Sequence, residues 1–232
     1  MDRSAFESES VFPAEPVPPR VFVEDVIPSL FVDLELSPEE RRAELRLGVV
    51  LRGEEGGEWT LHFVDGELGI GSPRAPECDV TIVQRVTDWR AALWEGRPAF
   101  VADAVHQLML PGAAGMRPGL HSGLSGLASM PDPQTVAELQ ALRGLVEVRV
   151  ASPGRVEPGG VDDWCLAIQL GPGPLATAPD ATIALGAEQA EAIHRGELHP
   201  IEALITGQLR LEGDLGLILQ LQALAMRAMI PR

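Results

Sequence analysis

The sequence contains no lysine and no tyrosine, and all 18 of its basic residues are arginines. Without lysine the chain cannot form a Schiff base, use a lysine general base or hold a nucleotide with a P-loop lysine. Against these arginines stand 34 acidic residues, which give a net charge of −16. An electric field of this sign repels phosphate backbones and anionic lipid surfaces, so we expect no nucleic-acid partner.

Cysteines, leader segments and long apolar runs are also scarce. The two cysteines, Cys78 and Cys165, form no C-x-x-C motif, which favours two small buried thiols in a reducing compartment over a disulfide or a metal site. The first residues lack the basic and apolar regions of a signal peptide. No uncharged apolar run reaches the roughly 18 residues needed to span a bilayer. We therefore expect an acidic, cytoplasmic protein without stable membrane insertion.

The residues that could carry out chemistry do not form a recognisable site. His194 and His199 are separated by Gly196, which interrupts the helix predicted there, and they match no spacing of metal ligands. The glycines around Ser122 and Ser125 superficially match a nucleophile elbow, but the strand and helix that the motif requires are absent from the pattern. We expect no enzyme, no metal and no cofactor.

The composition divides the chain into four segments. Residues 1–20 are rich in proline and acid, which predicts a disordered or extended tail. Residues 111–133 are rich in glycine and proline and nearly uncharged, as is typical of a linker. Two regions with strand and helix patterns remain, and we expect a first domain over residues 21–110 and a second over residues 134–232.

The second region repeats elements of the first. The segment starting at Asp180 (Asp-Ala-Thr-Ile) matches the segment starting at Asp79 (Asp-Val-Thr-Ile), and each precedes a predicted helix that ends at Gly96 or Gly196. Both pairs lie about 100 residues apart. This spacing predicts a tandem duplication.

The richest local pattern lies near the C-terminus. Residues 208–212 alternate polar and apolar side chains, which predicts a half-buried strand, and Asp214 is a good N-cap for the helix predicted over Leu215–Met229. Apolar residues cover more of this helix than the single face of about 100° that a core requires. Either the helix walls a space for an apolar ligand, or it covers an interface between the two halves or between two chains.

The order of these elements resembles the sterol carrier protein 2 (SCP2) family of lipid-binding domains, best over residues 179–224. The resemblance implies an α/β (α+β) fold of two SCP2-like repeats, each with a mixed or antiparallel sheet of about five strands and helices covering one face. In the first repeat no pattern matches the last strand and helix, so we expect them to be lost or replaced.

The family implies non-catalytic binding of an apolar, lipid-like ligand (fatty-acyl, isoprenoid or sterol-like) in an apolar tunnel of the second domain. The expected contacts are the apolar residues around the last strand and helix: Ile193, Ile201, Leu204, Leu209, Leu211, Leu215, Ile218, Leu221 and Leu224. The alternative is a structural or assembly module without a small ligand, in which the last helix lies at a protein interface. A homo-oligomer or a protein partner remains open in both cases.

Overall fold

The computed structural model of the chain describes residues 12–32, 36–99, 133–155 and 157–228. We call residues 12–99 the first half and residues 133–228 the second half. The predicted linker, apart from residue 133, and the last residues of the predicted first domain lie within residues 100–132, outside the described residues. Residues 1–11 of the predicted tail also lie outside them.

The first half begins with a helical segment made of α1 (Pro19–Val21), the π-helical turn η1 (Phe22–Val26) and α2 (Ile27–Val32). The chain stays helical through Pro28, where a proline usually breaks a helix. Proline has no N–H to donate, and its ring crowds the carbonyl four residues earlier. The π turn, in which the Ile27 N–H bonds to the Phe22 carbonyl, widens the helix ahead of the proline and accommodates it.

The segment before the first strand forms a capping box between Ser37 and Glu40. The Ser37 N–H donates to Glu40 Oε2 at 2.7 Å, and the Glu40 N–H donates to Ser37 Oγ at 3.2 Å. The helix that follows is only the 3-10 turn η2 (Glu40–Arg42), because strand β1 begins three residues later.

The remaining elements of both halves are strands and helices. The first half continues with β1 (Leu45–Arg52), β2 (Gly57–Val64), β3 (Glu67–Gly71), β4 (Val80–Arg85) and α3 (Val86–Trp94). The second half contains α5 (Pro133–Ala141), β5 (Gly144–Val150), β6 (Trp164–Leu170), β7 (Ala181–Leu185), α6 (Ala187–His194), α7 (Pro200–Ile205), β8 (Leu209–Gly213) and α8 (Leu215–Ala228). The mixed α/β class predicted from the sequence is confirmed.

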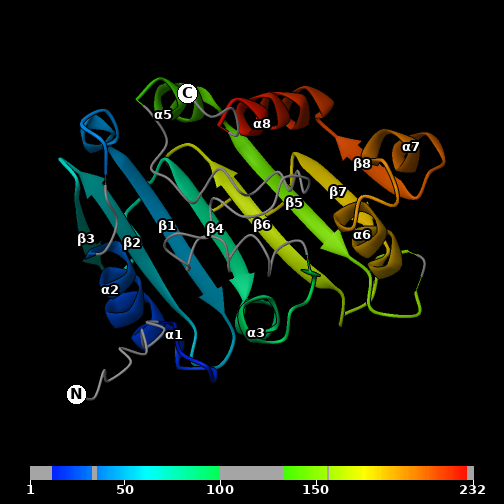
Figure 1. The fold of residues 1–232 in the computed structure, drawn as a ribbon, viewed down its shortest axis with the longest axis horizontal. Helices are drawn as coiled ribbons and strands as arrows, with labels where there is room; N and C mark the ends of the chain where they lie inside the picture. The colour runs from blue at the N-terminus through cyan, green and yellow to red at the C-terminus, as the bar shows by residue number, and fades with distance from the viewer. Residues whose placement is uncertain (1–11, 33–35, 100–132, 156, 229–232) are drawn as a thin grey trace, which may run out of the picture.

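The strands form one sheet, where we had expected two. Its order is β3-β2-β1-β4-β6-β5-β7-β8, so each half contributes four strands to a sheet of eight (Figure 1). The halves meet where β4 and β6 pair antiparallel, with Ile82 opposite Ile168. An unpaired edge at either strand would leave backbone N–H and C=O groups without partners, and the pairing satisfies both edges.

The helices lie on one face of this sheet (Figure 1). Alternate strand residues face them, and these residues are apolar in both halves. In the first half they pack with Phe22, Val23, Trp89 and Leu93. In the second half they form two clusters, one that includes Trp164 and Ala190 and one under α8 that includes Leu217 and Ile218.

The opposite face of the sheet is largely polar. Its side chains pair across and along the strands, as His62 does with Glu44 and Arg149 with Glu147. Cys165 also lies on this face, and its Sγ is 2.9 Å from Glu147 Oε1. Burial and then the neighbouring Glu147 carboxylate raise the pKa of Cys165 to about 12, so the thiol stays protonated. Both cysteines are free; Cys78 is buried as expected, whereas Cys165 is only half-buried.

No helix in the described part of the chain is long and apolar enough to cross a membrane.

Candidate functional site

A cavity of about 580 Å³ lies between α3 of the first half and α6 of the second half. Both helices cover the same end of the sheet, where β4 and β5 end and β6 begins (Figure 1). The apolar residues among those lining the cavity are mostly small and include Ala91, Val150, Ala151, Trp164, Ala187 and Ala190. Its volume lies within the range of about 300–1,000 Å³ that is usual for small-molecule sites.

Small side chains and one large ring explain why the space is open. Ala91 on α3 and Ala187 and Ala190 on α6 line the cavity, and their methyl groups cannot fill the space between the helices. Trp164 begins β6 opposite Val150, and its indole is buried. The Trp164 Nε1–H donates to the Asp88 carbonyl at 3.0 Å, which ties this ring to α3. The cavity therefore depends on both halves of the chain.

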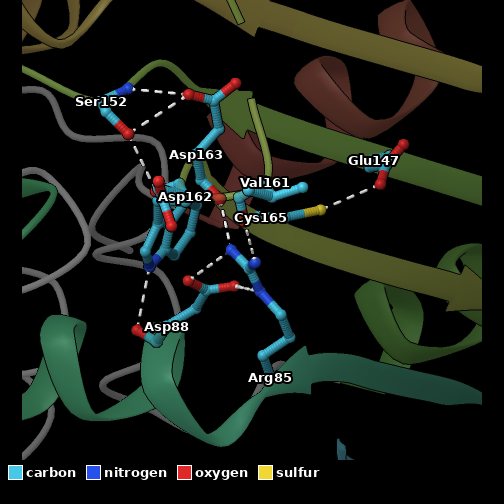
Figure 2. A network of polar contacts seen from close by, with 9 residues as sticks. Arg85, Asp88, Glu147, Ser152, Val161, Asp162, Asp163 and Cys165 are labelled. Atoms are coloured by element: carbon cyan, nitrogen blue, oxygen red, sulfur yellow. Dashed lines mark hydrogen bonds and ion pairs between the residues drawn. The ribbon is translucent and has the colours of Figure 1, made fainter. Parts of the chain in front are cut away.

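Arg85 organises the polar side of the cavity (Figure 2). Its guanidinium binds both carboxylate oxygens of Asp88, at 2.6 Å from Nε and 2.8 Å from Nη2. The same group donates to the carbonyl of Val161 at 2.5 Å and to the carbonyl of Asp163. The hydrogen bond to Asp88 raises the pKa of Arg85, so it remains charged. One side chain from the first half thus holds the segment that leads into β6.

Asp163 holds the loop beside this arginine. Its carboxylate accepts the N–H groups of Ser152 at 2.9 Å and Gly160 at 2.6 Å, and also that of Gly159. Burial opposes its ionisation, but the hydrogen bonds from Gly159, Ser152 and Gly160, aided by the charge of Arg155, lower the pKa of Asp163 to about 2. The ionised carboxylate therefore stabilises the fold above the pKa of about 4 of an unfolded aspartate, and this contribution is lost as the pH falls towards 2.

The rim of the cavity carries more acid than base. Arg85 and Arg97 face four acidic residues: Asp88, Glu95, Asp162 and Glu191. Both arginines are already paired, Arg85 with Asp88 and Arg97 with Glu95. No unpaired positive charge among the lining residues is therefore ready to receive an anionic group.

The nine residues predicted to contact a ligand do not line this cavity. Ile193 comes nearest, because it packs against the apolar cluster that contains Val150, Trp164 and Ala190. Leu211, Ile218 and Leu221 pack together in the cluster under α8, and Leu224 is buried on the same helix.

The other four predicted residues lie nearer the surface. Leu209 is half-buried on β8. Ile201 is 61% exposed, Leu204 42% and Leu215 50%.

A strip of buried and half-buried apolar side chains runs from the cavity towards the cluster under α8. Val148 and Leu166 follow Val150 and Trp164 along β5 and β6, and Val146 and Ile168 come next. Val150 and Val146 are four residues apart on one strand face, a span of about 13 Å. Ile183 adds a further half-buried side chain beside this strip on β7.

Sequence reasoning missed the cavity-lining residues because they come from both halves. The pattern gave no reason to place α3 beside α6, since the two halves were expected to have separate sheets. The usable signal was Trp164, a large aromatic residue between two aspartates and a strand.

Comparison with known proteins supports an assignment for the second half. Residues 126–226 match the model of the SCP-2 sterol transfer family. No curated protein matches the chain.

Among solved structures, the chain is similar to sterol carrier protein 2 like 2 from Aedes aegypti, with 24% identity over 39% of this chain and 88% of the other and a TM-score of 0.25. It is also similar to the sterol carrier protein domain 2 of Helicoverpa armigera, with 21% identity, coverage of 41% and 77%, and a TM-score of 0.29. Sterol carrier protein 2 from Yarrowia lipolytica, in its apo form, shows 13% identity, coverage of 42% and 78%, and a TM-score of 0.28.

These structural similarities are low, and the assignment rests on the family model. Its match leaves out the first half. Over residues 126–226, the chain is therefore similar to the SCP-2 sterol transfer family.

Proposed function

We propose that the second half binds an apolar, lipid-like molecule without catalysing a reaction on it, such as a fatty-acyl, isoprenoid or sterol-like compound. One observation carries this proposal. The cavity between α3 and α6 has an apolar floor, and that floor continues as half-buried apolar side chains towards the cluster under α8. Removing such side chains and a ligand's hydrocarbon from water contributes about 25 cal/mol per Å² of buried apolar area.

The proposed path starts at Val150 and Trp164 and runs over Val148 and Ile168 towards α8. Ile193, Leu211, Ile218, Leu221 and Leu224 lie in or beside the apolar clusters along this path and remain proposed contacts, with Leu209 at its far edge. The exposed Ile201, Leu204 and Leu215 lie outside these clusters. The family match agrees with this proposal, since the matching model is that of a sterol transfer family.

The charge at the rim favours a ligand whose polar end is neutral. The four acidic residues outnumber the two arginines, and both arginines have carboxylate partners. A carboxylate headgroup would therefore meet net repulsion, whereas a hydroxyl could accept or donate a hydrogen bond. We expect a long-chain alcohol or a sterol to bind more tightly than a fatty-acid anion of the same length.

The test uses the full-length protein. Native mass spectrometry and organic extraction of the purified protein should reveal a bound lipid, and the stripped protein should take up a fluorescent long-chain alcohol in preference to the matching acid. Replacing Ala187 by phenylalanine should fill the cavity and weaken uptake about tenfold.

The matched control is Ala184→Phe, because Ala184 lies on the opposite, polar face of the sheet beside Arg149. It should leave uptake unchanged. Absence of any bound lipid together with no uptake of either probe would overturn the proposed function. Equal binding of acid and alcohol would overturn only the preference for a neutral headgroup.

A further inference from the structure

Exposed apolar side chains gather around β8. Eight large apolar residues of the described chain are exposed, and five of them lie on the two helices that flank this strand. On α7, Ile201, Leu204 and Ile205 are 61%, 42% and 80% exposed. On α8, Leu215 and Leu219 are 50% and 61% exposed.

Helical spacing collects these residues into two stripes. Ile201, Leu204 and Ile205 share one face of α7, and the helix packs inward through Ala203, which is fully buried on the other side. Leu215 and Leu219 share one face of α8, whereas Leu217, Ile218 and Leu224 are buried. The exposed stripe of α8 explains why the apolar residues of this helix cover more than the face that packs against the core.

β8 lies between the stripes at one end of the sheet and pairs only with β7 among the described strands. The Asp214 N–H bonds to the Asp180 carbonyl at 2.8 Å. In an antiparallel ladder, every second residue points its N–H and C=O towards the same neighbour. Glu212 and Arg210 therefore direct their backbone groups to β7, and the backbone groups of Leu209 and Leu211 point outward.

The side chains of β8 are self-complementary in one antiparallel register. If two copies pair about a two-fold axis at Leu211, the outward backbone groups of Leu211 bond to those of the other Leu211, and each Arg210 lies opposite the other copy's Glu212. If the two-fold axis lay at Arg210 instead, the two arginines would lie opposite each other. If it lay at Glu212, the two glutamates would lie opposite each other. Opposite charges across antiparallel strands stabilise the pair and like charges destabilise it.

The same register brings the apolar stripes together. Helix α7 precedes β8 and α8 follows it, so in an antiparallel pair α7 of one copy comes to the end of β8 where α8 of the other copy begins. Ile201, Leu204 and Ile205 would then lie against Leu215 and Leu219 of the second copy, twice per interface. We propose that the chain forms a two-fold dimer through β8, with the α7 and α8 stripes covering each other.

Charge reversal on the full-length protein tests this register. The wild-type chain should sediment as a dimer at 0.15 M salt. At this salt concentration charges more than about 8 Å apart are largely screened, so the net charge of −16 per copy opposes association less than it does at low salt. Arg210→Glu and Glu212→Arg should each raise the dissociation constant about tenfold, because each change creates like-charge pairs at two symmetric places. The double variant should restore dimerisation, since the pairs are re-formed with reversed signs.

A second pair of variants tests the apolar stripes. Ile205→Asp should dissociate the dimer, whereas Val32→Asp should not, because Val32 is equally exposed (82%) but lies on α2 in the first half. Dimers unaffected by all three β8 and α7 single substitutions, or a monomer at every concentration, would overturn the proposal. Each variant should take up the lipid probes as the wild type does, which separates failure of the dimer from failure of ligand binding.

Discussion

Each half of the molecule lacks one strand that the other half has. At the junction, a strand of the other half occupies the empty position. In the first half the order is β3-β2-β1-β4, and in the second it is β6-β5-β7-β8. Both have a hairpin whose first strand pairs parallel with the strand before a helix, β1 with β4 and β5 with β7. The first half has no described strand after β4 to match β8, and the second has no strand after its hairpin to match β3.

The junction fills both positions with one strand pair. In the first half, β6 takes the position next to β4 that β8 takes next to β7 in the second half. In the second half, β4 takes the position next to β6 that β3 takes next to β2 in the first half. Backbone contacts repeat as well: the Asp79 carbonyl accepts the Gly171 N–H at 2.7 Å, and the Asp180 carbonyl accepts the Asp214 N–H at 2.8 Å. Each half can therefore lack a strand at the junction, because a strand of the other half covers the sheet edge that would otherwise be exposed. The tandem repeat itself stays a prediction from the sequence.

Separating the halves should have the largest effect. A fragment of residues 126–232 would expose the edge of β6, the Trp164 ring and the strip beside it, because β4 and α3 would be absent. We expect this fragment to lack a cooperative unfolding transition in urea, measured by circular dichroism, since a small domain of marginal stability cannot leave a central strand edge uncovered.

Mixing the two fragments gives the matching experiment. Residues 1–110 added to residues 126–232 should restore a cooperative transition, because the β4–β6 pairing can form between chains. A fragment 126–232 that unfolds cooperatively on its own, with the stability of the full chain, would show that each half is complete without the other.

Removing the arginine that joins the halves should have the next largest effect. Arg85→Met deletes the bonds to Asp88 and to the carbonyls of Val161 and Asp163, and leaves the Asp88 carboxylate, whose side chain is only 8% exposed, without its partner. Because an unpaired buried charge is costly, the free energy of unfolding should fall by about 3 kcal/mol. Urea titration of both proteins measures the difference.

The control for this change removes the stranded charge as well. Arg85→Met combined with Asp88→Leu should recover more than half of the loss, since the uncompensated carboxylate is gone. If the double variant is less stable than Arg85→Met, the cost lies in the lost contacts to the β6 segment rather than in the charge of Asp88.

The sequence predicted the elements well because their signals are local. Alternation located the strands, and Gly96 and Gly196 marked the ends of α3 and α6, where they adopt φ angles of 68° and 73°. The single sheet could not be predicted in this way. Pairing of β4 with β6 depends on which edges remain open after folding, and no residue pattern within either strand encodes its neighbour.

The candidate site shows the same limit. The apolar face of α8 was predicted from its spacing, and Leu217, Ile218 and Leu224 are indeed buried. Which of its apolar residues face the sheet and which remain exposed depends on how the helix rotates against its neighbours, so Leu215 was grouped with Ile218. The cavity escaped prediction because its walls are alanines from two helices that lie far apart in the sequence.

The smallest of the predicted effects compares the two halves most directly. Asp79 and Asp180 play matching roles: Asp79 Oδ2 accepts the Arg46 N–H, and Asp180 Oδ2 accepts the Leu145 N–H, both at 2.8 Å. Replacing either by alanine removes the acceptor for the first backbone N–H of a parallel strand pair. Because Asp79 is half-buried at the junction and Asp180 is exposed, we expect Asp79→Ala to cost about 2 kcal/mol and Asp180→Ala about 1 kcal/mol in urea unfolding.

The asparagine variants are the matched controls for this pair, since the amide oxygen can still accept the N–H. Asp79→Asn and Asp180→Asn should each retain most of the stability that alanine loses. The informative result is which alanine variant loses more unfolding free energy. Asp79 lies at the junction of β4 and β6, and its greater burial there is what should make its replacement more costly. Equal costs, or a larger cost at Asp180, would mean that the junction adds nothing to the role that the two aspartates share.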